Sequence, residues 1–192
     1  VVLANRIIEE GKADLVAMGS PLLADPHLPI KAKEGRPEDI RMCTACCTCW
    51  NNLKGAEVVT CSINAQLGHE ADLTIEPAAA SRKVFVVGGG PGGLEVARVA
   101  ATRGHKVTLV ERRPEVGGQL LEAVRPPLKE EWATLVDWYR VQLGKLGVEV
   151  RVNEECTVET VKRAEADVIV LATGANPAIP PVPGVRGTNV WT

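Results

Sequence analysis

The stretch from residue 83 to residue 112 constrains the fold more than any other part of the sequence. It opens with an unbroken apolar run at residues 84–87, which is typical of a strand buried on both faces of a parallel sheet. Apolar residues at helical spacing follow, and they predict a helix that ends near Gly104. A second apolar run at residues 107–110 then ends in an acidic residue. This order of elements predicts a βαβ unit and therefore an α/β fold built on a parallel sheet.

Three glycines at the first turn between strand and helix follow the spacing G-x-G-x-x-G. Gly88 permits the tight turn, Gly90 lets a pyrophosphate approach the backbone, and Gly93 allows the helix to pack closely on the strand. The helix N-terminus, which includes Pro91 and Gly92, then presents free N–H groups and the positive end of the helix dipole. The pattern predicts a dinucleotide site, and the alternative is a glycine-rich turn that holds no ligand.

An acidic residue and two glycine-containing loops extend this candidate site. Glu111, followed by Arg112, ends the second strand and is placed to accept hydrogen bonds from ribose hydroxyls. One loop follows Arg113, and the other follows an apolar run at residues 167–172 that predicts a further buried parallel strand. In both loops glycine lets the backbone pass close to a ligand. We expect the rest of the site to be lined by Gly118, Gln119, Leu120, Ala172, Thr173 and Gly174.

Four further elements are predicted in the second half of the chain. Residues 129–146 form the best amphipathic helix of the sequence, and residues 148–152 alternate as the next strand. A short helix is expected at residues 157–164, and the proline-rich residues 177–183 should leave the sheet as an extended crossover. The core-facing residues expected on the long helix are Trp132, Leu135, Val136, Tyr139, Leu143 and Leu146.

Four cysteines between residues 42 and 61 follow a metal-binding pattern. Their spacing is C-x2-C-x2-C followed by one remote cysteine, and the residues are Cys43, Cys46, Cys49 and Cys61. This spacing indicates a [4Fe-4S] cluster more than a zinc ion, because structural zinc sites usually pair two C-x2-C knuckles or one knuckle with histidine. A zinc site and a set of unligated thiols are the alternatives. The adjacent Cys47 is expected to be a packing thiol, since neighbouring side chains point in different directions.

The N-terminal part begins with an amphipathic helix at residues 1–10 and a short strand at residues 13–18. Gly19 and Ser20 follow the strand, and Ser20 can cap the next helix. A strand that ends in Gly-Ser at a helix start is a plausible phosphate seat. The alternative is a plain connection between strand and helix.

Charge and composition narrow the partners of the chain. Its 192 residues carry a formal net charge of −2 with a pI near 6.0, so we expect no nucleic-acid partner. No apolar run approaches the roughly 20 residues that cross a bilayer, so we expect no membrane partner. Four of the six cysteines lie between Cys43 and Cys49, as in a metal site of a reducing compartment, which favours the cytoplasm. The chain opens without Met, and residues 190–192 resemble a strand start, so we expect a fragment of a longer protein.

With these motifs in place, the sequence resembles the two-domain members of the Old Yellow Enzyme family, namely 2,4-dienoyl-CoA reductase, trimethylamine dehydrogenase and their relatives. The resemblance covers essentially the whole chain and is carried by the cysteine segment and by DLVAMGSPLLADPHLP, VVGGGPGGLEVA, ERRPEVGGQL and VIVLATGANPAIPPVPG. It implies that residues 1–40 are the last strand and helix of an FMN-binding TIM barrel. Residues 41–80 would then be the [4Fe-4S] loop and linker, and residues 81–192 a Rossmann-like domain that binds FAD or ADP.

The resemblance also implies a function. Electrons would pass between the FAD or ADP domain and FMN through the cluster, with Gly19 and Ser20 near the FMN phosphate. The implied activity is NAD(P)H-dependent reduction of an activated C=C bond in a small-molecule substrate, of the enoate or dienoyl-CoA type. The alternatives are an amine dehydrogenase or demethylase that passes electrons to an electron-transfer flavoprotein, and a zinc-stabilised nucleotide-binding module that is not an enzyme. Residues that act on substrate lie in earlier barrel strands of the family, so we expect no catalytic residue in this chain.

Overall fold

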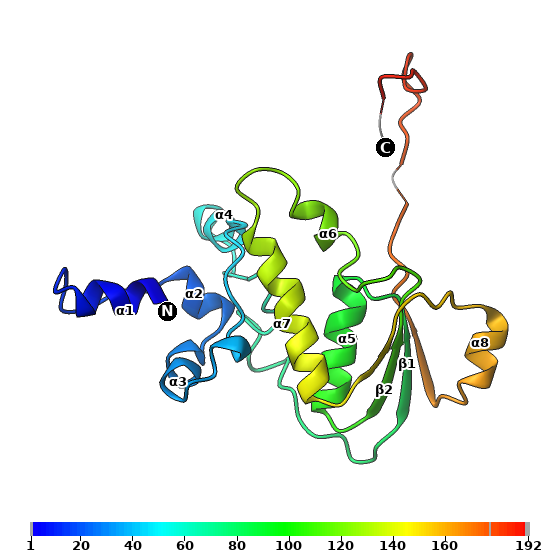
Figure 1. Ribbon diagram of the computed structural model, residues 1–192, viewed down its shortest axis with the longest axis horizontal. Helices are drawn as coiled ribbons and strands as arrows, with labels where there is room; N and C mark the ends of the chain where they lie inside the picture. Colours follow the sequence, from blue (N-terminus) through cyan, green and yellow to red (C-terminus); the bar gives the residue numbers. More distant parts are fainter. Residues whose placement is uncertain (1, 177, 191–192) are drawn as a thin grey trace.

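The structure is a computed structural model that describes residues 2–176 and 178–190 (Figure 1). Three expectations reach outside these residues: the helix start at Val1, Pro177 in the proline-rich crossover, and the strand start that includes Trp191 and Thr192. In chain order the elements are α1 (Val2–Glu9), α2 (Ser20–Ala24), α3 (Leu28–Lys33), the 3-10 helix η1 (Pro37–Asp39), α4 (Thr48–Lys54), β1 (Lys83–Val87), α5 (Pro91–Thr102), β2 (Lys106–Val110), α6 (Leu120–Ala123), α7 (Glu131–Lys145), β3 (Glu149–Arg151), α8 (Val158–Arg163) and β4 (Val168–Leu171).

Four parallel strands form one sheet in the order β3-β2-β1-β4. At its centre Val86 of β1 lies opposite Leu109 of β2 and Val170 of β4. Helices α5 and α7 cover one face of the sheet and α8 covers the other, as Figure 1 shows. Strand order and helix placement are those of a Rossmann-type fold, so the predicted α/β class with a parallel sheet is confirmed.

The unbroken apolar run of β1 contributes buried side chains to both faces of this sheet. Val84 and Val86 belong to the main core under α5 and α7, whereas Phe85 and Val87 belong to a smaller core on the side of α8. Successive side chains of a strand point to opposite faces, so a strand covered on both sides has no position for a polar residue. The prediction of a strand buried on both faces is therefore confirmed for β1.

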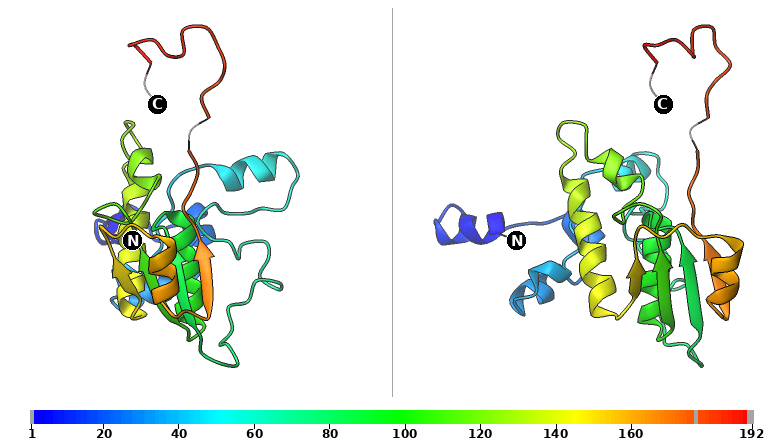
Figure 2. Two further views of the ribbon diagram at one scale, coloured as in Figure 1. Left: turned by 90° about the vertical axis from the view of Figure 1, so that its right-hand side faces the viewer. Right: turned by 45° about the vertical axis from the view of Figure 1, so that its right-hand side comes forward.

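The edge strand β4 differs from the prediction. It was expected to be buried, yet Ile169 is 45% exposed and Leu171 is 75% exposed. The reason is its position, because β4 pairs with β1 on one side and has no strand beyond it among the described residues. The residues that follow, 178–190, run away from the strand ends and do not cover β4 (Figure 2).

The long helix α7 buries most of its predicted stripe, with two differences. Leu135, Val136, Tyr139 and Leu143 are buried under the sheet as expected. Leu146, however, lies at the C-cap and is 36% exposed, because the helix ends there. Conversely, a side chain outside the predicted stripe, that of Trp138, is buried.

The expected strand at residues 13–18 is absent from the structure. This segment has no regular secondary structure and pairs with no strand in the described chain, and Leu15 is 87% exposed. A β-strand requires a neighbour for its backbone N–H and C=O groups, so apolar composition alone does not produce one. The following helix begins at Ser20 itself, with Gly19 rather than Ser20 in the N-cap position.

Helix η1 attaches the N-terminal part to the Rossmann-type domain through α7. The indole N–H of Trp138 donates to the Asp39 carbonyl over 2.9 Å, and the Asp39 carboxylate accepts from Gln142 over 2.9 Å and from Lys145 over 2.8 Å. The guanidinium of Arg41 stacks 5.1 Å from the centre of the Trp138 ring. These contacts bury Trp138 and fix the start of the cysteine segment, two residues after Arg41, beside the sheet domain.

Candidate functional site

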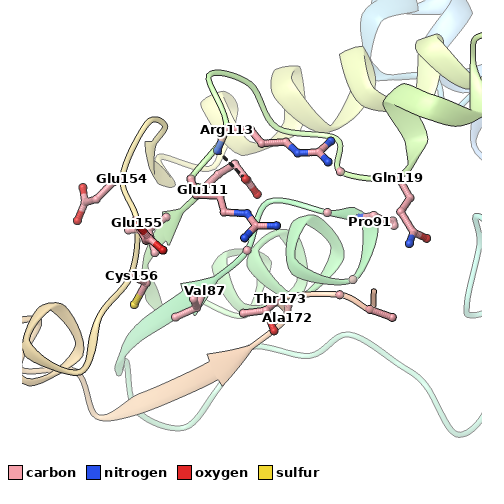
Figure 3. Close-up of a pocket in the computed structure, with 18 residues that line it drawn as sticks. Val87, Pro91, Glu111, Arg113, Gln119, Glu154, Glu155, Cys156, Ala172 and Thr173 are labelled. Atoms are coloured by element: carbon pink, nitrogen blue, oxygen red, sulfur yellow. Dashed lines mark hydrogen bonds between the residues drawn. The ribbon is translucent and has the colours of Figure 1, made fainter. Parts of the chain in front are cut away.

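A cavity of about 450 Å³ lies at the carboxyl ends of the strands, which is where ligands bind to open α/β sheets. Its walls come from the β1–α5 turn, the loop after β2, the loop after β3 and the segment after β4 (Figure 3). Most residues predicted from the sequence line this cavity: Gly88, Gly90, Pro91, Gly92, Glu111, Arg112, Gly118, Gln119, Ala172, Thr173 and Gly174. The topology thus brings together segments that are far apart in the sequence.

Four predicted residues lie elsewhere. Gly93 is buried between α5 and the β1–α5 turn, where an added Cβ would be only 1.9 Å from the Gly88 carbonyl oxygen. Leu120 is 6% exposed and belongs to the main core. Gly19 and Ser20 lie at the start of α2, and Ser20 lines a different cavity, the one formed by the cysteine segment.

The β1–α5 turn leaves open space in front of the helix N-terminus. Gly90 occupies the N-cap position of α5, no side chain caps the first turn, and that turn contains no acidic residue. A Cβ added at Gly90 would meet no atom nearer than the Cα of Gly118, at 4.0 Å. At Gly88, by contrast, φ is +106° and a Cβ would lie 2.4 Å from the Ala172 carbonyl oxygen. Gly88 is therefore required by the fold, whereas at Gly90 the missing side chain leaves space for a ligand.

The Glu111 side chain is 7% exposed and is held by two backbone groups. Its Oε2 accepts a hydrogen bond from the N–H of Gly89 over 2.7 Å. Its Oε1 accepts one from the N–H of Arg113 over 2.8 Å (Figure 3). Each carboxylate oxygen has a further lone pair. The carboxylate is thus fixed at the end of β2 and can still accept hydrogen bonds from a ligand.

The loop after β3 supplies cavity residues that the sequence motifs did not identify, namely Glu154, Glu155 and Cys156. Figure 3 places them at one end of the cavity, with Gln119 at the other. Burial, together with the charge of Glu154, raises the pKa of the Cys156 thiol. No short motif marks this loop, but the rule that ligands bind at the carboxyl ends of parallel strands could have identified it once residues 148–152 were assigned as a strand.

A second cavity, of about 420 Å³, is formed by the cysteine segment. All four predicted ligands line it as half-buried free thiols: Cys43, Cys46, Cys49 and Cys61. Within residues 2–176 and 178–190, no group of three or more His, Cys, Asp or Glu side chains is arranged to hold a metal ion. The four thiols therefore share one cavity without converging on a single point. Cys47 also reaches this cavity, but its side chain is exposed and its backbone is left-handed, with φ of 61°.

Hydroxyl groups surround one of these thiols. The Cys46 Sγ lies 2.9 Å from the Ser62 Oγ and 3.4 Å from the Thr48 Oγ1. Burial opposes ionisation, but the hydrogen bonds with Ser62 and Thr48, with a smaller effect from the nearby Thr44 hydroxyl, lower the pKa of the Cys46 thiol to about 7. At Cys43, by contrast, burial and the neighbouring thiols raise the pKa. The cavity thus favours the thiolate form at Cys46.

Comparison with known proteins identifies a matching family profile and several relatives of the chain. A family profile described as FAD dependent oxidoreductase matches residues 83–175. A metal reductase of Desulforamulus reducens is 41% identical over 98% of this chain and 30% of its own length, and a cinnamate reductase of Clostridium sporogenes is 40% identical over 91% of this chain and 26% of its own. A solved structure of 2-naphthoyl-CoA reductase with 2-naphthoyl-CoA superimposes with a TM-score of 0.93 at 40% identity, covering 97% of this chain and 29% of that protein.

The chain is a homologue of the Old Yellow Enzyme-like flavin oxidoreductases. It spans about 30% of the length of the curated relatives it matches. Those flavin oxidoreductases include both alkene reductases and amine dehydrogenases. Their names and the matching family profile support a flavin cofactor and an oxidoreductase of this type. None of the helices in the described part of the chain is long and apolar enough to cross a membrane.

Proposed function

We propose that this chain is the electron-relay part of a flavin oxidoreductase, with FAD or ADP bound at the strand ends and a [4Fe-4S] cluster bound in the cysteine cavity. The proposal is carried by the occurrence of two cavities in one chain, one walled by glycines and one lined by four thiols. The contact between η1 and α7 attaches the part that holds the thiols to the part that holds the glycines. Residues 81–192 act as the nucleotide domain, residues 41–80 as the cluster loop and linker, and residues 1–40 as the end of an FMN-binding barrel.

The nucleotide would be held mainly by backbone. The N–H groups at the start of α5 face the open space at Gly90 and suit a pyrophosphate. Glu111 would accept hydrogen bonds from the adenosine ribose, since each of its oxygens keeps a free lone pair. The segments around Gly118 and Thr173 would line the remainder. When bound, the flavin supplies hydride and single-electron chemistry that protein side chains lack.

The cluster would be held by the thiolates of Cys43, Cys46, Cys49 and Cys61. The four thiols line one cavity, and their C-x2-C-x2-C spacing with one remote cysteine favours a cluster over zinc. The buried Thr44 hydroxyl has no hydrogen-bond partner in the described structure, which also suits a group that brings sulfur acceptors. When bound, the cluster would supply one-electron transfer between the nucleotide domain and FMN. Free thiols and a cluster fit a reducing compartment, and we place the protein in the cytoplasm.

For the longer protein we propose NAD(P)H-dependent reduction of an activated C=C bond in a small molecule. The relatives at 40–41% identity include reductases, one of them named for cinnamate. A second candidate, amine dehydrogenation or demethylation with an electron-transfer flavoprotein as acceptor, is favoured by relatives that are dehydrogenases of methylated amines. In both cases Gly19 and Ser20 would lie near the FMN phosphate, and the catalytic residues would lie outside this chain.

The proposal is tested by anaerobic reduction of the full-length protein with NADH. We expect both the flavin absorption and a broad cluster absorption to bleach. In Cys49→Ser, which removes one cluster ligand, we expect a lower iron content, retention of FAD and loss of electron transfer between the two flavins. Normal transfer between the flavins in a Cys49→Ser protein without iron would contradict the relay. Reduction by a methylated amine instead of NADH would select the second candidate.

A further inference from the structure

The hydroxyl of Thr44 is a buried polar group without a partner. The residue is only 2% exposed. Its Oγ1 lies close enough to the Cys46 thiol to help lower the pKa of that thiol, but it makes no hydrogen bond of normal geometry among the described residues. Buried side-chain oxygens of native proteins nearly always find a partner, so such a group calls for an explanation. Thr44 follows the first cysteine of the cluster loop directly and lines the cysteine cavity.

The surroundings of Thr44 indicate what its partner is. The cavity that it lines contains the four thiols, and its other walls are mainly apolar, with Leu23, Trp50 and Ile63 among them. One of these thiols, Cys46, already lies beside the hydroxyls of Ser62 and Thr48. A thiolate or an inorganic sulfide only accepts hydrogen bonds, so a loaded cavity would turn these hydroxyls into donors and would also give Thr44 an acceptor.

We propose that Thr44 is a positioning residue for the cluster: its hydroxyl donates a hydrogen bond to a sulfur of the bound [4Fe-4S] group and thereby raises its reduction potential. This inference rests on the proposed cluster. A donor to sulfur stabilises the reduced state more than the oxidised state, because the reduced cluster carries one more negative charge. Hydrogen bonds to sulfur are one of the means by which proteins set cluster potentials.

The test is the midpoint potential of the cluster, measured by a redox titration followed by EPR in full-length protein purified anaerobically. Thr44→Val keeps the size and branching of the side chain and removes the hydroxyl. We expect a lower potential, by about a tenfold change in the one-electron equilibrium, which corresponds to about 59 mV. Thr44→Ser restores the hydroxyl and should return the potential to that of the wild type.

A matched control is Thr60→Val. Thr60 is half-buried beside the last cluster cysteine, and its hydroxyl already has a partner, because it donates to the Asn52 side chain over 3.4 Å. The same chemical change there should leave the potential unchanged.

Two results would overturn the inference. One is an unchanged potential in Thr44→Val at full iron content. The other applies if Thr44→Val loses its iron. If Thr44→Ser then loses its iron as well, the methyl group of Thr44 and not its hydroxyl would be what holds the cluster in place. Wild-type protein that contains zinc and no iron would instead refute the proposed cluster itself, so the two failures are distinguishable.

Discussion

The two candidate sites of this molecule are built in different ways. The nucleotide cavity is walled largely by backbone, at glycines whose conformation the sheet and α5 determine. The cysteine cavity is lined by side chains from a segment without strands, in which Ala45 and Cys47 adopt left-handed backbone conformations with φ of 50° and 61°. The comparison teaches that the fold alone forms the first site, whereas the second, if it holds the proposed cluster, would depend on the bound group to complete it.

The largest expected effect separates two adjacent cysteines. Cys46→Ser should remove most of the iron from the full-length protein, because a [4Fe-4S] cluster requires four thiolates. Cys47→Ser should leave the iron content unchanged, since Cys47 is exposed and its thiol lies near the carbonyl of Ala45. Iron analysis of both variants makes the measurement. Equal iron loss in the two would show that Cys47 is a ligand and would require a different ligand set.

A substitution at Gly93 tests whether the fold determines the nucleotide cavity. A Cβ there would be 1.9 Å from a carbonyl oxygen of the β1–α5 turn, and backbone cannot move aside as a side chain can. Gly93→Ala should therefore destabilise the domain by about 3 kcal/mol, at the upper end of the usual cost of overpacking. Chemical unfolding provides the measurement. A cost below about 0.5 kcal/mol would mean that α5 packs less tightly than the structure indicates.

Gly90 should show the opposite behaviour, a loss of binding without a loss of folding. Its φ of −75° suits any residue and a Cβ would enter open space, so Gly90→Val should fold normally. Its side chain would occupy the place of the pyrophosphate, and we expect about 100-fold weaker binding of FAD, equivalent to about 2.8 kcal/mol. The control is Gly144→Ala, on an exposed part of α7 with no atom within 4 Å of the added Cβ. Unchanged flavin content in Gly90→Val would refute this nucleotide site.

The smallest expected effect concerns the attachment of the cysteine segment to the nucleotide domain. The hydrogen bond from Lys145, opposed by burial and helped by Arg36 and Gln142, lowers the pKa of Asp39 far below its usual value. Asp39→Asn should lower the free energy of unfolding by about 1–2 kcal/mol at pH 7. The effect is modest because Lys145 is half exposed and solvent screens its charge. The measurement is chemical unfolding followed by tryptophan fluorescence, to which the buried Trp138 beside Asp39 contributes.

The pH dependence of this effect has a definite sign. The pKa of Asp39 is lower in the folded protein than in the unfolded chain, where it is about 3.9. The contribution of its ionised carboxylate to the free energy of unfolding is therefore fully present above about pH 3.9. It is lost as the pH falls below about 4. The stability difference between the wild type and Asp39→Asn should therefore be constant near neutral pH and shrink in acid. A difference that grows in acid would contradict the assigned ion pair.

Local patterns predicted the nucleotide domain well because its determinants are local. The apolar run at residues 84–87, the three glycines and Glu111 each specify their own neighbours, and the structure brings Gly88, Gly90 and Glu111 to one cavity. Predictions that depended on neighbours elsewhere in space were less successful. Residues 13–18 form no strand and β4 is exposed, since an apolar run cannot supply the strand that should pair with it or the layer that should cover it.

The missed residues have the same explanation. Trp138 lies outside the apolar stripe of its helix and is buried by Asp39 and Arg41, which come from a segment about a hundred positions earlier. The cavity residues after β3, including Cys156, become visible only when the strand order is known. Cysteine spacing, which is a local signal, identified the four thiols that share a cavity.

The metal content of the full-length protein, purified without oxygen, tests the central claim most directly. Iron, zinc and FAD are measured per chain in the same sample. The account predicts about four irons, no zinc and a bound flavin nucleotide, as a [4Fe-4S] cluster on four cysteines requires. One zinc per chain without iron would contradict the electron relay and would make the chain a zinc-stabilised nucleotide-binding module.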